Sequence, residues 1–191
     1  MGFGDVYKRQ GTGLRKIDPV TDCVLDEDSY LEMDTIQLRG VDRTTRSTSA
    51  VLGKGAKIVV RERIMTDGDE EAVTKFHVEL NGEDSGADLV SRSVARGNSH
   101  QAFYSVVEGN NRCTGHSACD AILADNGKVD AQPALNAANV DAALIHEAAI
   151  GKIAGEQILK LCSLGLTREE AEEKIIEGFL CLLYTSPSPR D

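Results

Sequence analysis

The stretch SGADLVSRSVARG, residues 85–97, says more about the fold of this chain than any other. Small residues are frequent in it, so a strand built from it carries many short side chains; they are Ser85, Gly86, Ala87, Ser91, Ser93, Ala95 and Gly97. Such strands suit stacked coils whose layers lie close together, which favours a β-helix among the all-β architectures. No hexapeptide or nonapeptide repeat is found, so a sandwich and a barrel remain open alternatives.

The region around this stretch, from about residue 29 to about residue 138, consists of short apolar runs separated by turn residues. The run KIVV at 57–60 and the alternating segments 76–80 and 119–123 indicate strands. Residues that tolerate a positive φ lie between such runs, at Asp67-Gly68, Asn81-Gly82, Gly109-Asn110-Asn111 and Asn126-Gly127. We therefore interpret residues 11–138 as a β-helix core that lacks its N-terminal part.

The period of the apolar residues changes after Pro133. The segment 141–165 places side chains on one face at helical spacing and ends at Gly165, a residue suited to a left-handed C-cap. Thr167 and Glu170 match a capping box, which predicts a second helix over 168–177. The face of the first helix is expected to carry Ile150, Ile153, Gln157, Ile158 and Leu161. Residues 139–180 are thus expected to form a short C-terminal helical segment.

Composition excludes several classes of protein. The chain has 191 residues and a formal net charge of -10, which argues against nucleic acid or an anionic membrane as a partner. It contains neither a run of about 20 apolar residues nor a secretion signal, so we expect a cytoplasmic protein. The five cysteines form no CxxC pair, which fits neither a disulfide framework nor a zinc finger and predicts free thiols.

The two ends of the chain differ from their neighbours in composition and periodicity. Residues 1–10 and 181–191 resemble translated sequencing-adapter sequence, and we interpret both as non-native tails. On this interpretation the natural protein begins before Gly11.

Residues with metal-binding side chains gather between positions 113 and 147. They are Cys113, His116, Cys119, His146 and Glu147. Thiolate, imidazole and carboxylate together are ligands for zinc or iron, and thiolate favours iron-sulfur clusters. The alternative is a structural role, because a cysteine in an alternating strand, such as Cys119, is often a small buried core residue. A carboxylate at the start of a helix is likewise stabilised without any metal. The phosphate-loop, dinucleotide-binding, nucleophile-elbow and HExxH motifs are all missing from the sequence.

The same region resembles a known family. The segments CDAIL at 119–123, ALIHEAAIGKI at 143–153, EEA at 169–171 and IEGF at 176–179, together with Pro133 and Gly165-Leu166, are similar to the C-terminal core of the SufB/SufD proteins. The similarity runs from about Asp84 to Phe179 and includes the order and spacing of these segments.

This resemblance implies a right-handed parallel β-helix followed by a helical segment. It also implies a non-enzymatic scaffold subunit of the SUF iron-sulfur cluster assembly complex, on which a transient cluster is built before its transfer to apoproteins. The implied partners are a second subunit, in a homodimer or a SufB/SufD-type heterodimer, a SufC-type ABC ATPase that hydrolyses the ATP, and a cysteine desulfurase system that donates sulfur.

Carried over position by position, the resemblance places Cys119 at the cysteine implicated in holding the nascent cluster. It places Glu147 and His146 at the His-Glu-Ala motif, so all three residues are candidate iron ligands. A thiolate from a strand and a carboxylate or imidazole from the following helix are expected to converge at the seam between two subunits. Cys113 and His116 match nothing in the family and are interpreted as structural.

Departures from the family leave the subtype open. Its members have more β-helix at the N-terminal end. They also continue with further helices beyond the position of Phe179. The shorter C-terminus of this chain leaves docking of the ATPase in doubt and suggests a compact SufB/SufD-like subtype. One alternative is a SufD-like partner that supports assembly without binding the cluster. Another is a polysaccharide-active β-helix enzyme that uses paired acids. The acidic residues of the 67–71 run, however, have the character of a solvated loop.

Overall fold

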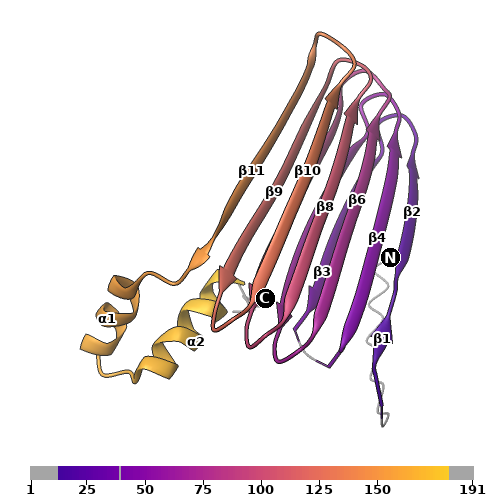
Figure 1. The fold of residues 1–191 in the computed structure, drawn as a ribbon. Helices are drawn as coiled ribbons and strands as arrows, with labels where there is room; N and C mark the ends of the chain where they lie inside the picture. The colour runs from indigo at the N-terminus through magenta and orange to yellow at the C-terminus, as the bar shows by residue number, and fades with distance from the viewer. Residues whose placement is uncertain (1–12, 39, 181–191) are drawn as a thin grey trace, which may run out of the picture.

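The computed structural model describes residues 13–38 and 40–180. Its strands form a stack of coils that builds two facing sheets, and two helices follow the stack (Figure 1). The non-native tails predicted at 1–10 and 181–191 lie outside the described residues. The elements are β1 (Lys16–Ile17), β2 (Val20–Leu25), β3 (Tyr30–Gln37), β4 (Arg43–Leu52), β5 (Lys57–Thr66), β6 (Glu71–Leu80), β7 (Ser85–Ala95), β8 (His100–Gly109), β9 (Cys113–Leu123), β10 (Lys128–Ala137), β11 (Ala142–Lys152), α1 (Gly155–Ser163) and α2 (Arg168–Phe179).

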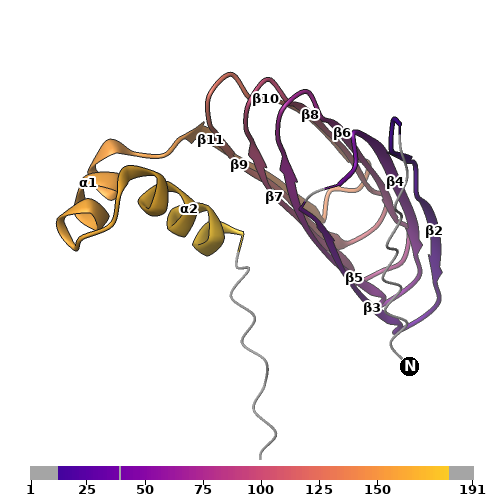
Figure 2. The same ribbon diagram turned by 90° about the horizontal axis from the view of Figure 1, so that it is seen from below.

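Strand pairing confirms the parallel β-helix and shows that the sandwich and barrel alternatives are wrong. One sheet has the order β1-β4-β6-β8-β10, with β2 also paired to β4, and the other has the order β11-β9-β7-β5-β3. Neighbouring strands are parallel and come from successive coils, so the chain passes between the two sheets at every turn. Figure 2 shows the two sheets enclosing a common interior.

The coils repeat at intervals of 27 to 29 residues, as the contacts between adjacent coils show. Ser85 pairs with Cys113, for example, and Cys113 pairs in turn with Ala142. The turns fall between the strands where the sequence predicted them, and equivalent turn positions recur with positive φ. One corner has Asp28, Gly55 and Asp84, and the other has Gly40, Gly68, Gly97 and Asp125.

Side chains on the inner faces of the two sheets form the core. The inner face of each sheet is the one that lines the interior between them. Phe76 and Phe103 meet edge to face with ring centroids 5.8 Å apart, and aliphatic side chains fill most of the remaining space. The strands predicted at 57–60, 76–80 and 119–123 lie within β5, β6 and β9, which confirms them.

The helix predicted from about residue 141 is wrong over its first half. Residues 142–152 form β11, which pairs with β9 along its whole length, and the first helix begins only at Gly155. The predicted change from strands to helices at 138–139 therefore comes too early. Alanine and leucine favour helix, but the open edge of β9 offers a full ladder of hydrogen bonds, and tertiary pairing overrides local propensity.

The second helix and its cap are confirmed. The Thr167 hydroxyl accepts a hydrogen bond from the Glu170 N–H at 3.2 Å, and the Glu170 carboxylate accepts one from the Thr167 N–H at 2.8 Å. Gly165 has a φ of +99°, as expected of the residue that ends the first helix. Ile176 packs with Val94 and Met65 and so attaches α2 to the stack. Across residues 13–38 and 40–180, neither helix has the length and apolar character needed to span a bilayer.

Candidate functional site

The register between β9 and β11 distributes the predicted site residues over two faces. Cys119 pairs with Ala148, while His146 pairs with Ser117 and Glu147 pairs with Ala118. Side chains alternate along a strand, so Cys119 and His146 share the inner face and Glu147 points to the outer face. All three were expected to come together across a strand and a helix. The structure instead places His146 and Glu147 on β11 and brings only His146 to the face of Cys119.

Cys119 lies in the interior of the stack and is 1% exposed. Ser91 is its neighbour on β7, and Glu62 is the neighbour of Ser91 on β5, so these three residues form one inner-face row. Burial raises the pKa of the Cys119 thiol to about 11, and the negative charges of Asp120 and Glu62 act in the same direction. The thiol is therefore protonated at neutral pH and must lose its proton before it binds a metal.

The pH dependence of the Cys119 nuclear magnetic resonance signal tests this environment. A thiol whose pKa is raised from 9.0 to about 11 stabilises the folded state below pH 9, and this contribution is lost as the pH rises toward 11. We expect the ¹³Cβ chemical shift of Cys119 in the folded, ¹³C-cysteine-labelled chain, which needs no reagent to reach the buried sulfur, to titrate near pH 11. In urea the same cysteine should titrate near its ordinary pKa. Titration at or below pH 9 in the folded chain contradicts this account.

His146 lies on the inner face of the terminal strand β11. Both of its ring nitrogens are buried; neither has a side-chain hydrogen-bond partner among the described residues, and the backbone of Ser117 is the polar group that acts on the ring. Burial lowers the pKa of His146, and the nearby His116 adds to this effect. The neutral imidazole is the form that binds metals, and buried polar atoms are rarely left without a partner. The chemistry and the position of His146 therefore make it a candidate metal ligand.

Glu147 extends from the outer face, and its side chain is 72% exposed. Its carboxylate lies 3.6 Å from Nε2 of His116, whose Nδ1 lies 2.7 Å from the carboxylate of Asp88. The three residues come from β11, β9 and β7, and we call them the outer histidine cluster. His116 was expected to be structural, and sequence spacing carried no signal of its two carboxylate neighbours.

A buried ion pair near Cys119 also escaped sequence analysis. Glu62 is fully buried, with its carboxylate 3.1 Å from Nε of Arg46, and it accepts hydrogen bonds from the hydroxyls of Thr74 at 2.9 Å and Ser91 at 3.1 Å. Burial raises the pKa of Glu62, while Arg46 and the two hydroxyls oppose this effect. The alternation of KIVV, continued past residue 60, would have predicted an inward carboxylate at this position.

The cysteines within the described residues agree with the prediction of free thiols. Cys23, Cys113, Cys119 and Cys162 are all free thiols, as expected. Cys113 is buried in the core at the opposite end of β9 from the helices. Within the described part of the chain, no three His, Cys, Asp or Glu side chains are grouped so as to hold a metal ion by themselves. Cys119 and His146 on the inner face are therefore two candidate ligands, fewer than a metal site needs.

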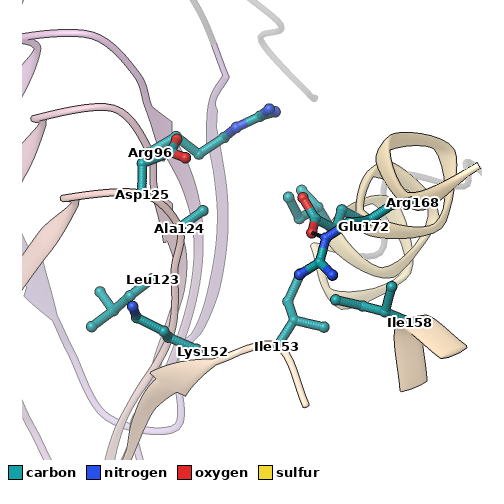
Figure 3. Close-up of a pocket in the computed structure, with 10 residues that line it drawn as sticks. Arg96, Leu123, Ala124, Asp125, Lys152, Ile153, Ile158, Arg168 and Glu172 are labelled. Carbon is teal, nitrogen blue, oxygen red and sulfur yellow. Dashed lines mark hydrogen bonds and ion pairs between the residues drawn. The ribbon is translucent and has the colours of Figure 1, made fainter. Parts of the chain in front are cut away.

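A separate cavity of about 400 Å³ lies where the last strands meet the helices (Figure 3). Lys152 and Arg96 line it from the stack, and Arg168, Glu172 and Ile176 line it from α2. Neither Cys119 nor His146 lines this cavity. An ion pair of 2.7 Å between Arg96 and Glu173 joins the stack to α2 beside it. The acidic 67–71 run lies mostly in the exposed turn between β5 and β6, as predicted.

Comparisons with known proteins identify the family. The chain is 38% identical over 124 residues to an iron-sulfur cluster assembly SufBD family protein of Archaeoglobus fulgidus, covering 64% of this chain and 32% of that protein. Proteins of the same name from Methanothermobacter thermautotrophicus and Methanocaldococcus jannaschii are 32% identical over 144 residues and 27% identical over 166 residues. These matches cover 74% and 86% of this chain and 35% and 52% of the two relatives.

The chain thus spans about a third to about half of the length of these relatives. A family model described as the SufBD core domain of the SUF system for FeS cluster assembly matches residues 18–179, nearly all of the described structure. The chain therefore belongs to the SufBD family.

Proposed function

We propose that this chain is a scaffold subunit on which a nascent iron-sulfur cluster is assembled before its transfer to apoproteins. The observation that carries the proposal is that Cys119 and His146 face the same interior from adjacent strands, with both imidazole nitrogens buried. Thiolate and imidazole are ligands that iron-sulfur clusters accept. The cluster is cargo, so the chain itself performs no catalysis.

Two protein ligands are too few for a cluster held by four, which supports a second subunit. Strands β10 and β11 are the last in their sheets, so each has an edge open to another chain. Apolar side chains of Leu135, Ile145 and Ile150 are exposed on these strands. A homodimer or a SufB/SufD-type heterodimer formed there brings further ligands to the seam. Glu147 remains a proposed iron ligand, acting from the outer face.

The other proposed partners follow from the family and from the helices. A SufC-type ABC ATPase docks on the helical segment, where Leu159 and Leu164 are 70% and 73% exposed. A cysteine desulfurase system donates the sulfur, and the complex works in the cytoplasm. Because Cys119 is 1% exposed and protonated, cluster loading requires the last coil to open and the thiol to lose its proton. ATP hydrolysis by the partner can supply the energy for this opening.

Anaerobic reconstitution with ferrous iron and sulfide tests the proposal. We expect a brown protein with charge-transfer absorbance, and we expect Cys119→Ser to lose most of that absorbance. Cys113→Ser is the matched control, because Cys113 is also buried on β9 but lies at the other end of the strand. A colourless wild type, or equal absorbance in the two variants, contradicts the proposal.

A second candidate is a structural subunit that supports assembly without binding the cluster, as SufD-like partners do. The burial of Cys119 favours this candidate, since a protonated thiol in a core is also an ordinary packing residue. The two candidates differ in one result. A structural subunit remains colourless alone, and in a reconstituted complex with its partner it gives the same absorbance with or without Cys119→Ser.

A further inference from the structure

One histidine on the outer face of the β3–β11 sheet lies between carboxylates from both neighbouring strands. Nδ1 of His116 is 2.7 Å from the Asp88 carboxylate on β7, and Nε2 is 3.6 Å from the Glu147 carboxylate on β11. The hydrogen bond with Asp88 fixes the ring, and it assigns the proton to Nδ1 when the imidazole is neutral. The lone pair is then on Nε2, the nitrogen that lies 3.6 Å from Glu147.

We propose that His116 Nε2 and Glu147 bind a divalent first-row metal ion, with Asp88 as the residue that positions the imidazole. Metal bonds to nitrogen and oxygen are about 2.0–2.2 Å long, so one ion bridges ligand atoms up to roughly 4 Å apart, and the separation of 3.6 Å lies within this limit. A carboxylate bonded to the far nitrogen of a metal-binding histidine is the usual supporting arrangement.

The other outward histidines provide an internal comparison. His77 lies 3.3 Å from Glu108, and His100 lies 2.7 Å from Asp130; within the described residues neither has a second carboxylate in ion-pair contact. Ion pairs between coils are frequent on this surface, and such exposed pairs contribute little to stability. His116 differs because it has a second carboxylate on the side of its free nitrogen. The second carboxylate is the feature by which we distinguish a metal-binding histidine from a histidine in an ordinary surface ion pair.

The site is open and has two protein ligands, so water completes the coordination and the ion exchanges readily. The side chains of His116 and Glu147 are 36% and 72% exposed. Glu147 directly follows His146, so an ion held here lies one residue along β11 from the inner-face histidine. Only the identity of the metal rests on the proposed function. If the chain assembles clusters, the ion is ferrous iron held at the outer face before it joins sulfide.

Cobalt(II) titration of the full chain without sulfide, followed by calorimetry and visible absorbance, tests the site. We expect one bound ion per chain, retained in Cys119→Ser and weakened at least tenfold in His116→Gln and Glu147→Gln. Asp88→Asn is expected to weaken binding about tenfold with an unchanged thermal midpoint, which a merely structural role would not produce. His77→Gln is the matched control and should bind as the wild type does.

Wild-type affinity in His116→Gln, or equal losses in His116→Gln and His77→Gln, overturns the proposal. Because this titration contains no sulfide, its outcome is independent of whether a cluster forms at Cys119. A chain that binds cobalt at His116 but remains colourless in reconstitution keeps the metal site and loses the scaffold function.

Discussion

Replacing Glu62 with Ala is expected to destabilise the folded chain by about 3–5 kcal/mol, because it leaves Arg46 without its buried partner. Glu62 is fully buried, and its carboxylate lies 3.1 Å from the Arg46 guanidinium, which is itself only 19% exposed. The change also removes the acceptor for the hydroxyls of Thr74 and Ser91. Urea unfolding followed by circular dichroism measures the loss through the shift in midpoint.

The exposed pair Arg61 and Glu32 is the matched control, because Arg61 lies beside Glu62 in β5 but faces outward. Both members are close to half exposed, so Glu32→Ala should cost no more than about 1 kcal/mol. The double change Arg46→Met with Glu62→Leu should recover much of the stability, since an apolar pair avoids desolvating two charges. If Glu62→Ala lowers the free energy of unfolding by no more than Glu32→Ala does, the buried ion pair does not stabilise the fold as argued.

Replacing Gly82 with Ala is expected to cost at least about 2 kcal/mol through overpacking. Gly82 lies in the turn between β6 and β7, and an added Cβ would overlap the backbone of Gly53 and Lys54 in the preceding coil. The Gly82 N–H also donates to the Leu52 carbonyl at 3.0 Å, so the turn cannot move away without losing this bond. Thermal unfolding of the purified variant measures the effect.

Gly178→Ala is the control for this change. Gly178 lies in α2 with nothing within 4 Å of an added Cβ, so alanine should stabilise the helix by about 0.5–1 kcal/mol. The two substitutions are chemically identical and are expected to have opposite signs. Equal effects would mean that the coils are not in backbone contact at Gly82.

Local signals predicted most of the fold. Alternation located β6 and β9, and the Thr167 capping box located the start of α2, because each signal depends on residues close together in the sequence. The prediction of a helix over 142–152 failed because the apolar residues there are compatible with both a helical and a strand period. Only pairing with the edge of β9 decides between the two. The repeat of the coils was missed because equivalent turn positions hold different residues, such as Asp28 and Gly55.

The arrangement of the candidate site residues was not predicted, and their role in metal binding stays a prediction. The resemblance to the SufB/SufD family selected Cys119, His146 and Glu147, and family membership supports a role in cluster assembly. The division between inner and outer faces depends on strand register, which no short motif encodes. His116 was set aside because it matched no motif, and its carboxylate partners lie 28 and 31 residues away in sequence.

The central claim is that Cys119 and His146 hold the same iron-sulfur cluster from the inner face. Electron paramagnetic resonance of the reconstituted and reduced chain, prepared with ¹⁵N-labelled histidine, tests it most directly. The account predicts a ¹⁵N coupling to the cluster that persists in His116→Gln and disappears in His146→Ala. A cluster without histidine coupling, or one whose coupling survives in His146→Ala, would contradict it.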